Sequence, residues 1–336
     1  CRSTKNFLDF ALFVSFFPQL VAGPIERARH LLPQILADRK VVYDQVTRGL
    51  FLILLGLFKK VAIADGLAGS VDSVYSSGAA ASAIDIYAAT IAFTFQIYCD
   101  FSGYSDVARG TSKLLGIDLM RNFSLPYFSR APSDFWDRWH ISLSTWLRDY
   151  LYISMGGNRR GPIRTYFNLM MTMVLGGLWH GASWNFVLWG FIHGGILVLH
   201  RLYGNLRKRN PNYRPSQSML SELVSIAAMQ YFVLLAWIAF RVSDTADLKV
   251  ALSKFVFFDF DFGLANIGLG AISFFSSLLI MAAFAALHMA SHRVGQLDRF
   301  LGRASLGWAC VTCIIVGFTA CLLWPMTDAP FIYFQF

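Results

Sequence analysis

The side chain best suited to chemistry is a histidine inside a long apolar stretch. His180 stands in Leu-Trp-His-Gly at 178–181, and residues 165–199 around it contain no Lys, Arg, Asp or Glu. Such a stretch is long enough to cross a lipid bilayer. An ionisable residue at membrane depth is costly and therefore indicates function, although a histidine that only hydrogen-bonds a neighbouring helix explains this position equally well.

A second histidine, His140, lies 40 residues upstream in the aromatic and charged segment 121–152. There, the spacing of Trp136, Trp139 and Leu143 predicts one face of a single helix, with His140 on another side. The segment is too charged to cross lipid openly, so we expect it at the membrane interface or in a protein-lined cavity. An amphipathic helix that only anchors the protein at the interface is the alternative.

Two carboxylates end another apolar run. Asp100 and Asp106 stand among hydroxyl side chains and a glycine in the segment 96–106. They could be ligands, but a charge at the border of a membrane is usually paired with arginine. We therefore favour a structural role, in which they cap a helix end and pair with Arg109 or Arg121.

The composition is that of an integral membrane protein. Of the 336 residues, 56% are hydrophobic and 15% are charged, against about 25% charged residues in soluble domains. The net charge of +9 reflects cytoplasmic loops in such a protein, so nucleic acid is not an expected partner. The five cysteines form no disulfide framework, and the C-x-x-C at 310–313 lacks the second pair that a zinc site needs. We expect one domain over residues 1–336, without a metal or a tightly bound cofactor.

The apolar pattern predicts an all-α bundle. Helices are expected near residues 7–22, 49–64, 84–99, 165–180, 182–200, 223–242, 270–290 and 305–324. Several are shorter than the usual span of about 20 residues; Pro18 and Gly23-Pro24 interrupt the first, and Lys59-Lys60 cut the second. Short and broken helices are tolerated at membrane depth only where they line a cavity inside the protein. This pattern therefore predicts helices arranged around a central tunnel.

Basic residues predict the orientation. They precede the central pair of helices at Arg159, Arg160 and Arg164 and follow it at Arg201, Arg207, Lys208, Arg209 and Arg214. Because basic loops stay in the cytoplasm, this pair should be a hairpin that rises from the cytoplasm and turns near 181–183. The acidic segment 243–261 should then lie outside, the loop 293–303 inside, and residues 328–336 outside.

Several motifs resemble the membrane-bound O-acyltransferase family. These are Phe-Trp-Asp-Arg-Trp-His at 135–140 with Ile-Ser-Leu-Ser-Thr-Trp-Leu-Arg-Asp-Tyr-Leu-Tyr at 141–152, Gly-Gly-Asn-Arg at 156–159, and Leu-Trp-His-Gly at 178–181. Pro-Gln-Leu-Val-Ala-Gly-Pro-Ile at 18–25, the block 98–106 and residues 331–336 look like the bacterial alginate O-acetyltransferase branch. The D-alanyl transfer protein of teichoic acid synthesis is a more distant relative. The motifs cover about residues 15–200 and the C-terminus, and they are specific as a set.

The resemblance implies acyl transfer at the waist of a membrane-embedded tunnel, in a multi-pass protein of the bacterial inner membrane. The essential histidine of the family carries over to His180, and the upstream Trp-His to His140. The residues expected to line the tunnel or contact substrate are Trp136, Arg138, Trp139, Trp179 and Asn185. The family also has further N-terminal spans, which a chain starting at Cys1 is expected to lack.

The implied chemistry suits a buried imidazole. A hydroxyl is a weak nucleophile until a base removes its proton, and histidine is the commonest such base, contributing about 10²–10⁴-fold. Burial disfavours the imidazolium cation, so a buried His180 should be neutral and able to accept a proton at pH 7. Alignment and donors to the developing oxyanion supply the rest; His140, Asn185 or a backbone N–H could be such a donor.

The leading hypothesis is an O-acetyltransferase acting on an exported, alginate-like polysaccharide. The expected donor is cytoplasmic acetyl-CoA or a carrier-protein thioester. The acceptor is expected outside the membrane. The acetyl group is expected to reach it either directly or through periplasmic acetyltransferase partner proteins. Membrane lipid is the other expected partner. The sequence contains neither a G-x-G-x-x-G nor a P-loop motif, as expected if only a thioester arm enters the protein.

Two other functions compete with this hypothesis. One is a transporter or channel that passes acyl groups or glycans without transferring them, since intramembrane polar residues also mark pathways; the inverted repeat common in transporters is not found. The other is a haem protein using His180, His193 and His200. His193 and His200 are seven residues apart on one helix face, so they could not ligate one iron from opposite sides.

Overall fold

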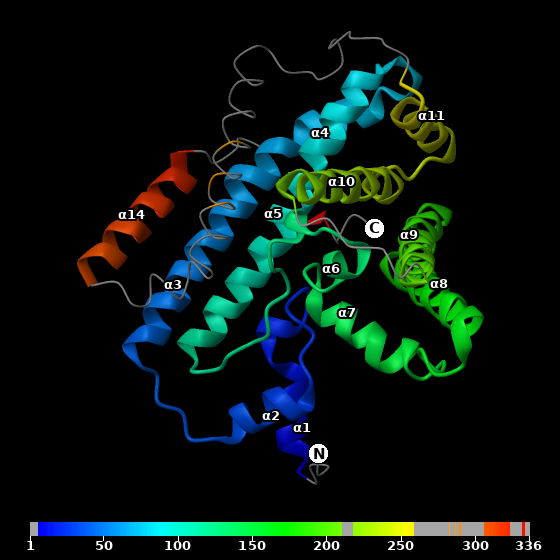
Figure 1. Cartoon of the computed structure of the whole chain (residues 1–336). Coiled ribbons are helices and arrows are strands. Elements are labelled where there is room, and N and C mark those ends of the chain that lie inside the picture. Colours follow the sequence, from blue (N-terminus) through cyan, green and yellow to red (C-terminus); the bar gives the residue numbers. More distant parts are fainter. Residues whose placement is uncertain are drawn as a thin grey trace. The chain divides into compact units, whose positions relative to one another are not determined.

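The computed structural model describes residues 6–209, 218–258, 306–322 and 331–332, together with positions 282, 286 and 289. Within these residues every regular element is a helix (Figure 1). The chain divides into two compact units. Unit 1 comprises Cys1–Gly69, Phe95–Asn122 and Leu269–Gln335, and unit 2 comprises Ser70–Thr94, Phe123–Gly268 and Phe336. The prediction of an all-α protein is confirmed for the described residues.

Unit 1 is built mainly from α3 and the second part of α5. Its elements are α1 (Phe7–Ser15), a 3₁₀ turn (Phe17–Gln19), α2 (Ala28–Leu36), α3 (Tyr43–Phe58), a π-helix (Lys59–Asp65), the start of α4 (Gly66–Ser76), the second part of α5 (Ala83–Leu114) and α14 (Leu306–Leu322). Helix α1 ends before Pro18, as the sequence predicted. On α14, Cys310 and Cys313 are free thiols.

Glycines let α3 and α5 lie in close antiparallel contact. A Cβ on Gly56 would press on the carbonyl oxygen of Gly103, and one on Gly103 would press on that of Gly56. The same relation joins Gly49 and Gly110. Only glycine has no side chain at such a contact, and small residues are the usual means by which membrane helices approach one another.

The α-helix is interrupted at the lysine pair, as predicted, since α3 ends at Phe58. The chain nevertheless stays helical there as a π-helix over Lys59–Asp65, and both ammonium groups are neutralised within unit 1. Lys59 Nζ lies 2.6 Å from Asp106 Oδ2, and Lys60 Nζ lies 3.0 Å from Asp100 Oδ1. A charge in an apolar setting is tolerated when it is paired in this way.

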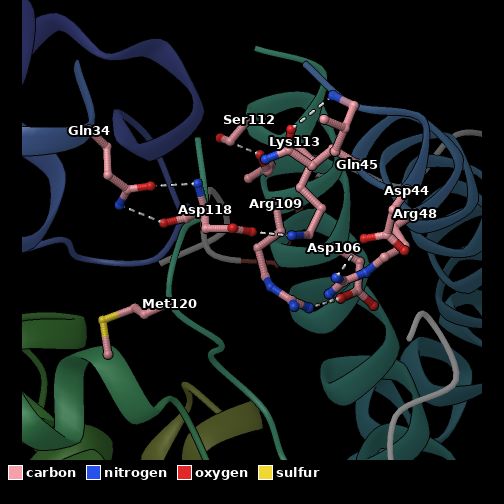
Figure 2. Close-up of polar contacts among 12 residues, drawn as sticks. Gln34, Asp44, Gln45, Arg48, Asp106, Arg109, Ser112, Lys113, Asp118 and Met120 are labelled. Carbon is pink, nitrogen blue, oxygen red and sulfur yellow. Dashed lines mark hydrogen bonds and ion pairs between the residues drawn. The ribbon is translucent and has the colours of Figure 1, made fainter. Parts of the chain in front are cut away.

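The predicted pairing of Asp106 with Arg109 is confirmed. Asp100 pairs with Lys60 rather than with an arginine, and neither carboxylate ends a helix, since α5 runs on to Leu114. Asp106 Oδ1 pairs with Arg109 at 3.2 Å, as Figure 2 shows. Asp100 Oδ2 accepts a 2.6 Å hydrogen bond from the backbone N–H of Ile332. These carboxylates therefore tie distant segments of unit 1 together.

The end of α5 is fixed to α2 by a side-chain amide. Gln34 donates through Nε2 to the backbone oxygen of Asp118 at 3.0 Å and accepts from its N–H at 2.9 Å (Figure 2). One amide thus satisfies both backbone polar groups of a residue outside any helix, which would otherwise need other partners.

Unit 2 contains the central hairpin. Its elements are the remaining parts of α4 and α5, 3₁₀ turns at Gly78–Ala80 and Pro126–Phe128, α6 (Pro132–Trp136), α7 (Ile141–Leu147), a π-helix (Arg148–Tyr152), α8 (Gly161–His180), α9 (Trp184–Lys208), α10 (Met219–Arg241) and α11 (Thr245–Val256). Helices α8 and α9 lie side by side (Figure 1) and join at residues 181–183. The predicted pair of helices joined at 181–183 is confirmed, and the basic residues Arg159, Arg160, Arg207 and Lys208 lie at its open end.

Glycines also set the separation of α8 and α9. A Cβ on Gly190 would overlap the backbone carbonyl of Met173, and one on Gly177 would overlap the backbone carbonyl of Phe186. Because both obstacles are backbone atoms, they cannot rotate away as a side chain would. The two helices can keep this distance only with glycine at both positions.

Two of the described helices, α9 and α10, are long and apolar enough to cross a membrane by length and composition. Helix α8, which contains Arg164, Asn168 and His180, is not among them. Most of the predicted helix at 270–290, the acidic residues Asp259 and Asp261, Arg214, the basic loop 293–303 and most of 328–336 lie outside the described residues.

The glycine contact gives a first test. Gly190→Ala should lower the stability of the protein by about 1–3 kcal/mol, the usual cost of overpacking, because α8 and α9 must move apart. Gly195→Ala, on the same helix, is the matched control: its Cβ would meet nothing within 4 Å, so the change should be neutral or slightly stabilising. The measurement is the thermal unfolding midpoint in detergent. Equal midpoints for the two variants would contradict the packing described.

Candidate active site

The imidazole of His180 lies in an aromatic cluster of unit 2. It belongs to the last residue of α8, and its ring centroid is 5.1 Å from that of Trp189 on α9 and 5.1 Å from that of Phe240 on α10. Both neighbours are nearly perpendicular to the imidazole, at 84° and 78°. Phe186 adds a fourth ring at 6.3 Å. Three helices therefore hold this side chain in apolar surroundings.

The predicted single helix around His140 is wrong. Helix α6 ends at Trp136, α7 begins at Ile141, and His140 between them has left-handed backbone angles of φ 41° and ψ 54°. Its carbonyl accepts the first backbone hydrogen bond of α7, from Ser144 at 2.9 Å. A residue other than glycine in this conformation costs about 1–2 kcal/mol, and such strain concentrates at functional sites.

The break brings His140 to the same cluster as His180. His140 is 3% exposed, and its ring lies 6.3 Å from that of Trp179, which in turn is 5.1 Å from the His180 ring. Burial lowers the pKa of His140 well below its usual value, and a positive charge on His180 would lower it further. His140 is therefore a neutral imidazole at pH 7, able to accept or donate one hydrogen bond at each nitrogen.

The two tryptophans before His140 have different surroundings. The Trp136 ring lies 5.8 Å from Trp189 and 5.0 Å from His193, so it belongs to the cluster. Trp139 instead stacks on Phe135 at 5.7 Å and lies 4.9 Å from Trp237. Trp139 therefore packs against Phe135 and Trp237 rather than against a histidine of the cluster.

The remaining predicted site residues lie at its margins. Arg138 pairs through Nε with Asp134 Oδ1 at 2.5 Å, which holds the turn after α6. Trp179 is 54% exposed, so one side of it is open. Asn185, in the first turn of α9, is buried.

Sequence reasoning missed His193 and Trp189 as parts of the site. His193 is buried on α9 among Phe135, Trp136 and Trp189, at ring distances of 5.8, 5.0 and 4.8 Å. From the sequence, His193 was considered only as a possible haem ligand together with His180 and His200. In the structure His200 is exposed. The signal that could have found it is the four-residue spacing of Asn185, Trp189 and His193 in an apolar helix, which places all three on one face.

The described part of the chain holds no group of three or more His, Cys, Asp or Glu side chains arranged to bind a metal ion. What the cluster offers is three imidazoles, those of His140, His180 and His193, and several indole N–H groups in apolar surroundings. Apolar surroundings disfavour the imidazolium cation, so an imidazole there is held in the neutral form that can accept a proton.

The chain is similar to several enzymes named for acyl transfer. It is 43% identical over 242 residues to a probable alginate O-acetylase of Azotobacter vinelandii, covering 72% of this chain and 46% of that protein. It is 41% identical over 244 residues to a peptidoglycan O-acetyltransferase of Helicobacter pylori, with 72% and 45% coverage. A teichoic acid D-alanyltransferase of Streptococcus thermophilus is 29% identical over 219 residues, with 60% and 51% coverage. The chain thus spans about half the length of the curated relatives it matches.

The family model for membrane-bound O-acyltransferases matches residues 2–221. This range contains α1 to α9, and with them His140, His180 and His193. The match agrees with the resemblance drawn from the motifs at 135–140 and 178–181, and the chain belongs to the membrane-bound O-acyltransferase family.

Proposed function

We propose that this protein is an O-acyltransferase of the bacterial inner membrane. It moves an acetyl group from a cytoplasmic thioester donor, acetyl-CoA or a carrier protein, across the membrane to hydroxyls of an exported, alginate-like polysaccharide. The transfer is direct or passes through a periplasmic partner protein. The observation that carries the proposal is the meeting of His140 and His180, from separate segments, in one aromatic cluster.

The relatives support the acyl-transfer part of this proposal. Their names describe transfer of acetyl to alginate, of acetyl to peptidoglycan and of D-alanyl to teichoic acid. In each case a small acyl group is joined to a polymer. The similarity to the alginate and peptidoglycan enzymes differs by two points of identity over nearly the same length, so the acceptor must be identified by assay with both polymers.

The proposed reaction uses His180 as the base. Its neutral imidazole takes the proton of the acceptor hydroxyl while the hydroxyl oxygen attacks the thioester carbonyl carbon, which gives a tetrahedral oxyanion. The oxyanion collapses, the carbon–sulfur bond breaks, and the imidazolium returns the proton to the leaving thiolate. The products are an ester and a free thiol. His140, with its fixed left-handed backbone, orients the reacting groups or donates a hydrogen bond to them.

His180→Ala should abolish acetyl transfer while the protein still folds in the membrane, because a neutral side chain is removed and no buried charge is left without a partner. His200→Ala, which removes an exposed imidazole from α9, is the matched control and should keep full activity. The assay follows a labelled acetyl group from acetyl-CoA into alginate and peptidoglycan. Normal transfer by the His180 variant would remove this residue from the mechanism.

Purified protein in detergent separates the enzyme from a channel. Without a sealed compartment, transport cannot produce an acetylated polymer, whereas catalysis still can. If the purified protein, supplied with donor, acceptor and any partner proteins, never transfers acetyl, the proposed enzyme is wrong.

The two histidines should act as one catalytic unit. Groups that act together lose activity non-additively, so His140→Ala combined with His180→Ala should be little worse than the more damaging single variant. Independent residues combine additively. The comparison needs the rates of all three variants, and losses that multiply would exclude a shared active site.

The proposed orientation makes a labelling prediction. In a variant without the five native cysteines, Arg160→Cys and Lys208→Cys at the open end of the hairpin should resist a membrane-impermeant thiol reagent added to intact cells. Ala182→Cys at the turn should be labelled, because the turn should face outward. Labelling at 160 and 208 but not at 182 would invert the orientation.

A further inference from the structure

One face of α9 carries a row of buried polar side chains. Asn185, Trp189 and His193 follow one another at four-residue intervals, which aligns them along about 12 Å of the helix. All three are at least nine-tenths buried. Helix α9 is one of the two described helices able to cross a membrane, where polar atoms facing lipid would be costly.

Each member of this row holds an atom without a hydrogen-bond partner among the residues that the structure describes. The atoms are Asn185 Oδ1, Trp189 Nε1 and His193 Nε2. A buried polar atom left unpaired costs about 1–3 kcal/mol, so each such atom in a native protein requires an explanation. Each of the three is therefore able to bond a polar group of a ligand that binds beside this face of α9.

The Trp189 indole is the member of the row placed for catalysis. Its ring centroid is 5.1 Å from that of His180, whereas the Trp136 ring contacts only Trp189 and His193 among the described histidines and tryptophans. A base and an oxyanion donor that act on the same carbonyl must each lie about 3 Å from its reacting atoms. The two groups must therefore be neighbours, as Trp189 and His180 are.

On the basis of the function proposed above, we propose that Trp189 is a catalytic residue whose indole N–H donates a hydrogen bond to the carbonyl oxygen of the acyl thioester. When the hydroxyl oxygen bonds to the carbonyl carbon, the carbonyl π electrons move onto that oxygen, and the bond from Nε1 strengthens as the charge grows. The indole N–H does not titrate, so it remains a donor at every pH at which His180 can act as a base. Fixed donors aimed at such a charge are most effective where water is excluded.

The chain offers a matched control in Trp237. Its Nε1 is also buried without a partner in the described part of the chain, and its ring lies 4.9 Å from Trp139 and 5.6 Å from Phe240. It has no described ring contact with any histidine. A change that removes the N–H from Trp237 therefore repeats the loss of a buried indole donor away from His180.

The test replaces each tryptophan with benzothienylalanine, which has nearly the same shape but sulfur in place of N–H. At position 189 the turnover of acetyl-CoA with alginate or peptidoglycan should fall by about 10²–10³-fold, the usual effect of losing one oxyanion donor, with KM little changed. At position 237 the turnover should stay near that of the unmodified protein. Trp189→Phe, which also removes the N–H, should follow the first variant.

Infrared spectroscopy gives a readout that packing alone would not change. The probe is S-acetonyl-CoA, an unreactive ketone analogue labelled with ¹³C at its carbonyl. Its bound carbonyl stretch should move to higher frequency in the position-189 variant than in unmodified protein, because a hydrogen bond is lost, and should not move in the position-237 variant.

The outcomes separate the two proposals. If the unmodified protein transfers acetyl but the position-189 variant matches it, or if both variants lose activity equally, only the role of Trp189 is wrong. If the unmodified protein neither transfers acetyl nor binds the analogue, the proposed enzyme is wrong and the role of Trp189 fails with it.

Discussion

The site depends on how closely α8 and α9 approach each other. His180 is the last residue of α8, and its ring meets Trp189 and Phe186 from α9. The distance between these helices is set where Gly177 and Gly190 face backbone carbonyls. Gly190 sets the distance between the helices, and it immediately follows Trp189. The close approach at Gly190 therefore also sets how near the Trp189 indole lies to the His180 imidazole. Packing and chemistry are thus determined by adjacent positions in the sequence.

A second constraint is the strained turn at His140. A continuous helix would carry the chain straight on from Trp136 through His140 into Leu143. The left-handed backbone of His140 ends that helical turn instead, so His140 reaches Trp179, while Trp136 contacts His193 and Trp139 contacts Trp237. The aromatic contacts that this conformation allows offset its backbone strain of about 1–2 kcal/mol.

Much of the fold could be predicted from the sequence because it rests on local patterns. Apolar runs located α3, α5, α8, α9, α10 and α14, and the Gly-Ala-Ser segment located the hairpin turn. The break at His140 could not be predicted, because a residue that disfavours left-handed angles adopts them only under tertiary contacts. The continuation of the helix through Lys59 was hidden for a similar reason, since its partner Asp106 is 47 positions away.

The candidate site was predictable in part. His180 and His140 were found because histidine is unusual in apolar or aromatic sequence and because the surrounding motifs resemble a family. Trp189 and His193 escaped notice because a tryptophan in an apolar helix resembles ordinary core packing. Their hydrogen-bonding state, which distinguishes them from core residues, is a property of the folded chain alone.

The buried polar groups around Lys59 and Lys60 differ in kind from those around His180, and the difference supports the location of the site. In unit 1 the interior carries full charges, and Lys59 and Lys60 meet carboxylates at 2.6 Å, so the cost of burying charge is offset within the protein. In unit 2 the polar atoms near His180 are neutral, and several have no partner in the described part of the chain. Burying an unpaired neutral group costs a modest free energy, whereas burying an unpaired charge costs far more. A site that must receive the uncharged carbonyl of a thioester, and stabilise charge only while the reaction occurs, is expected to be built in the second way.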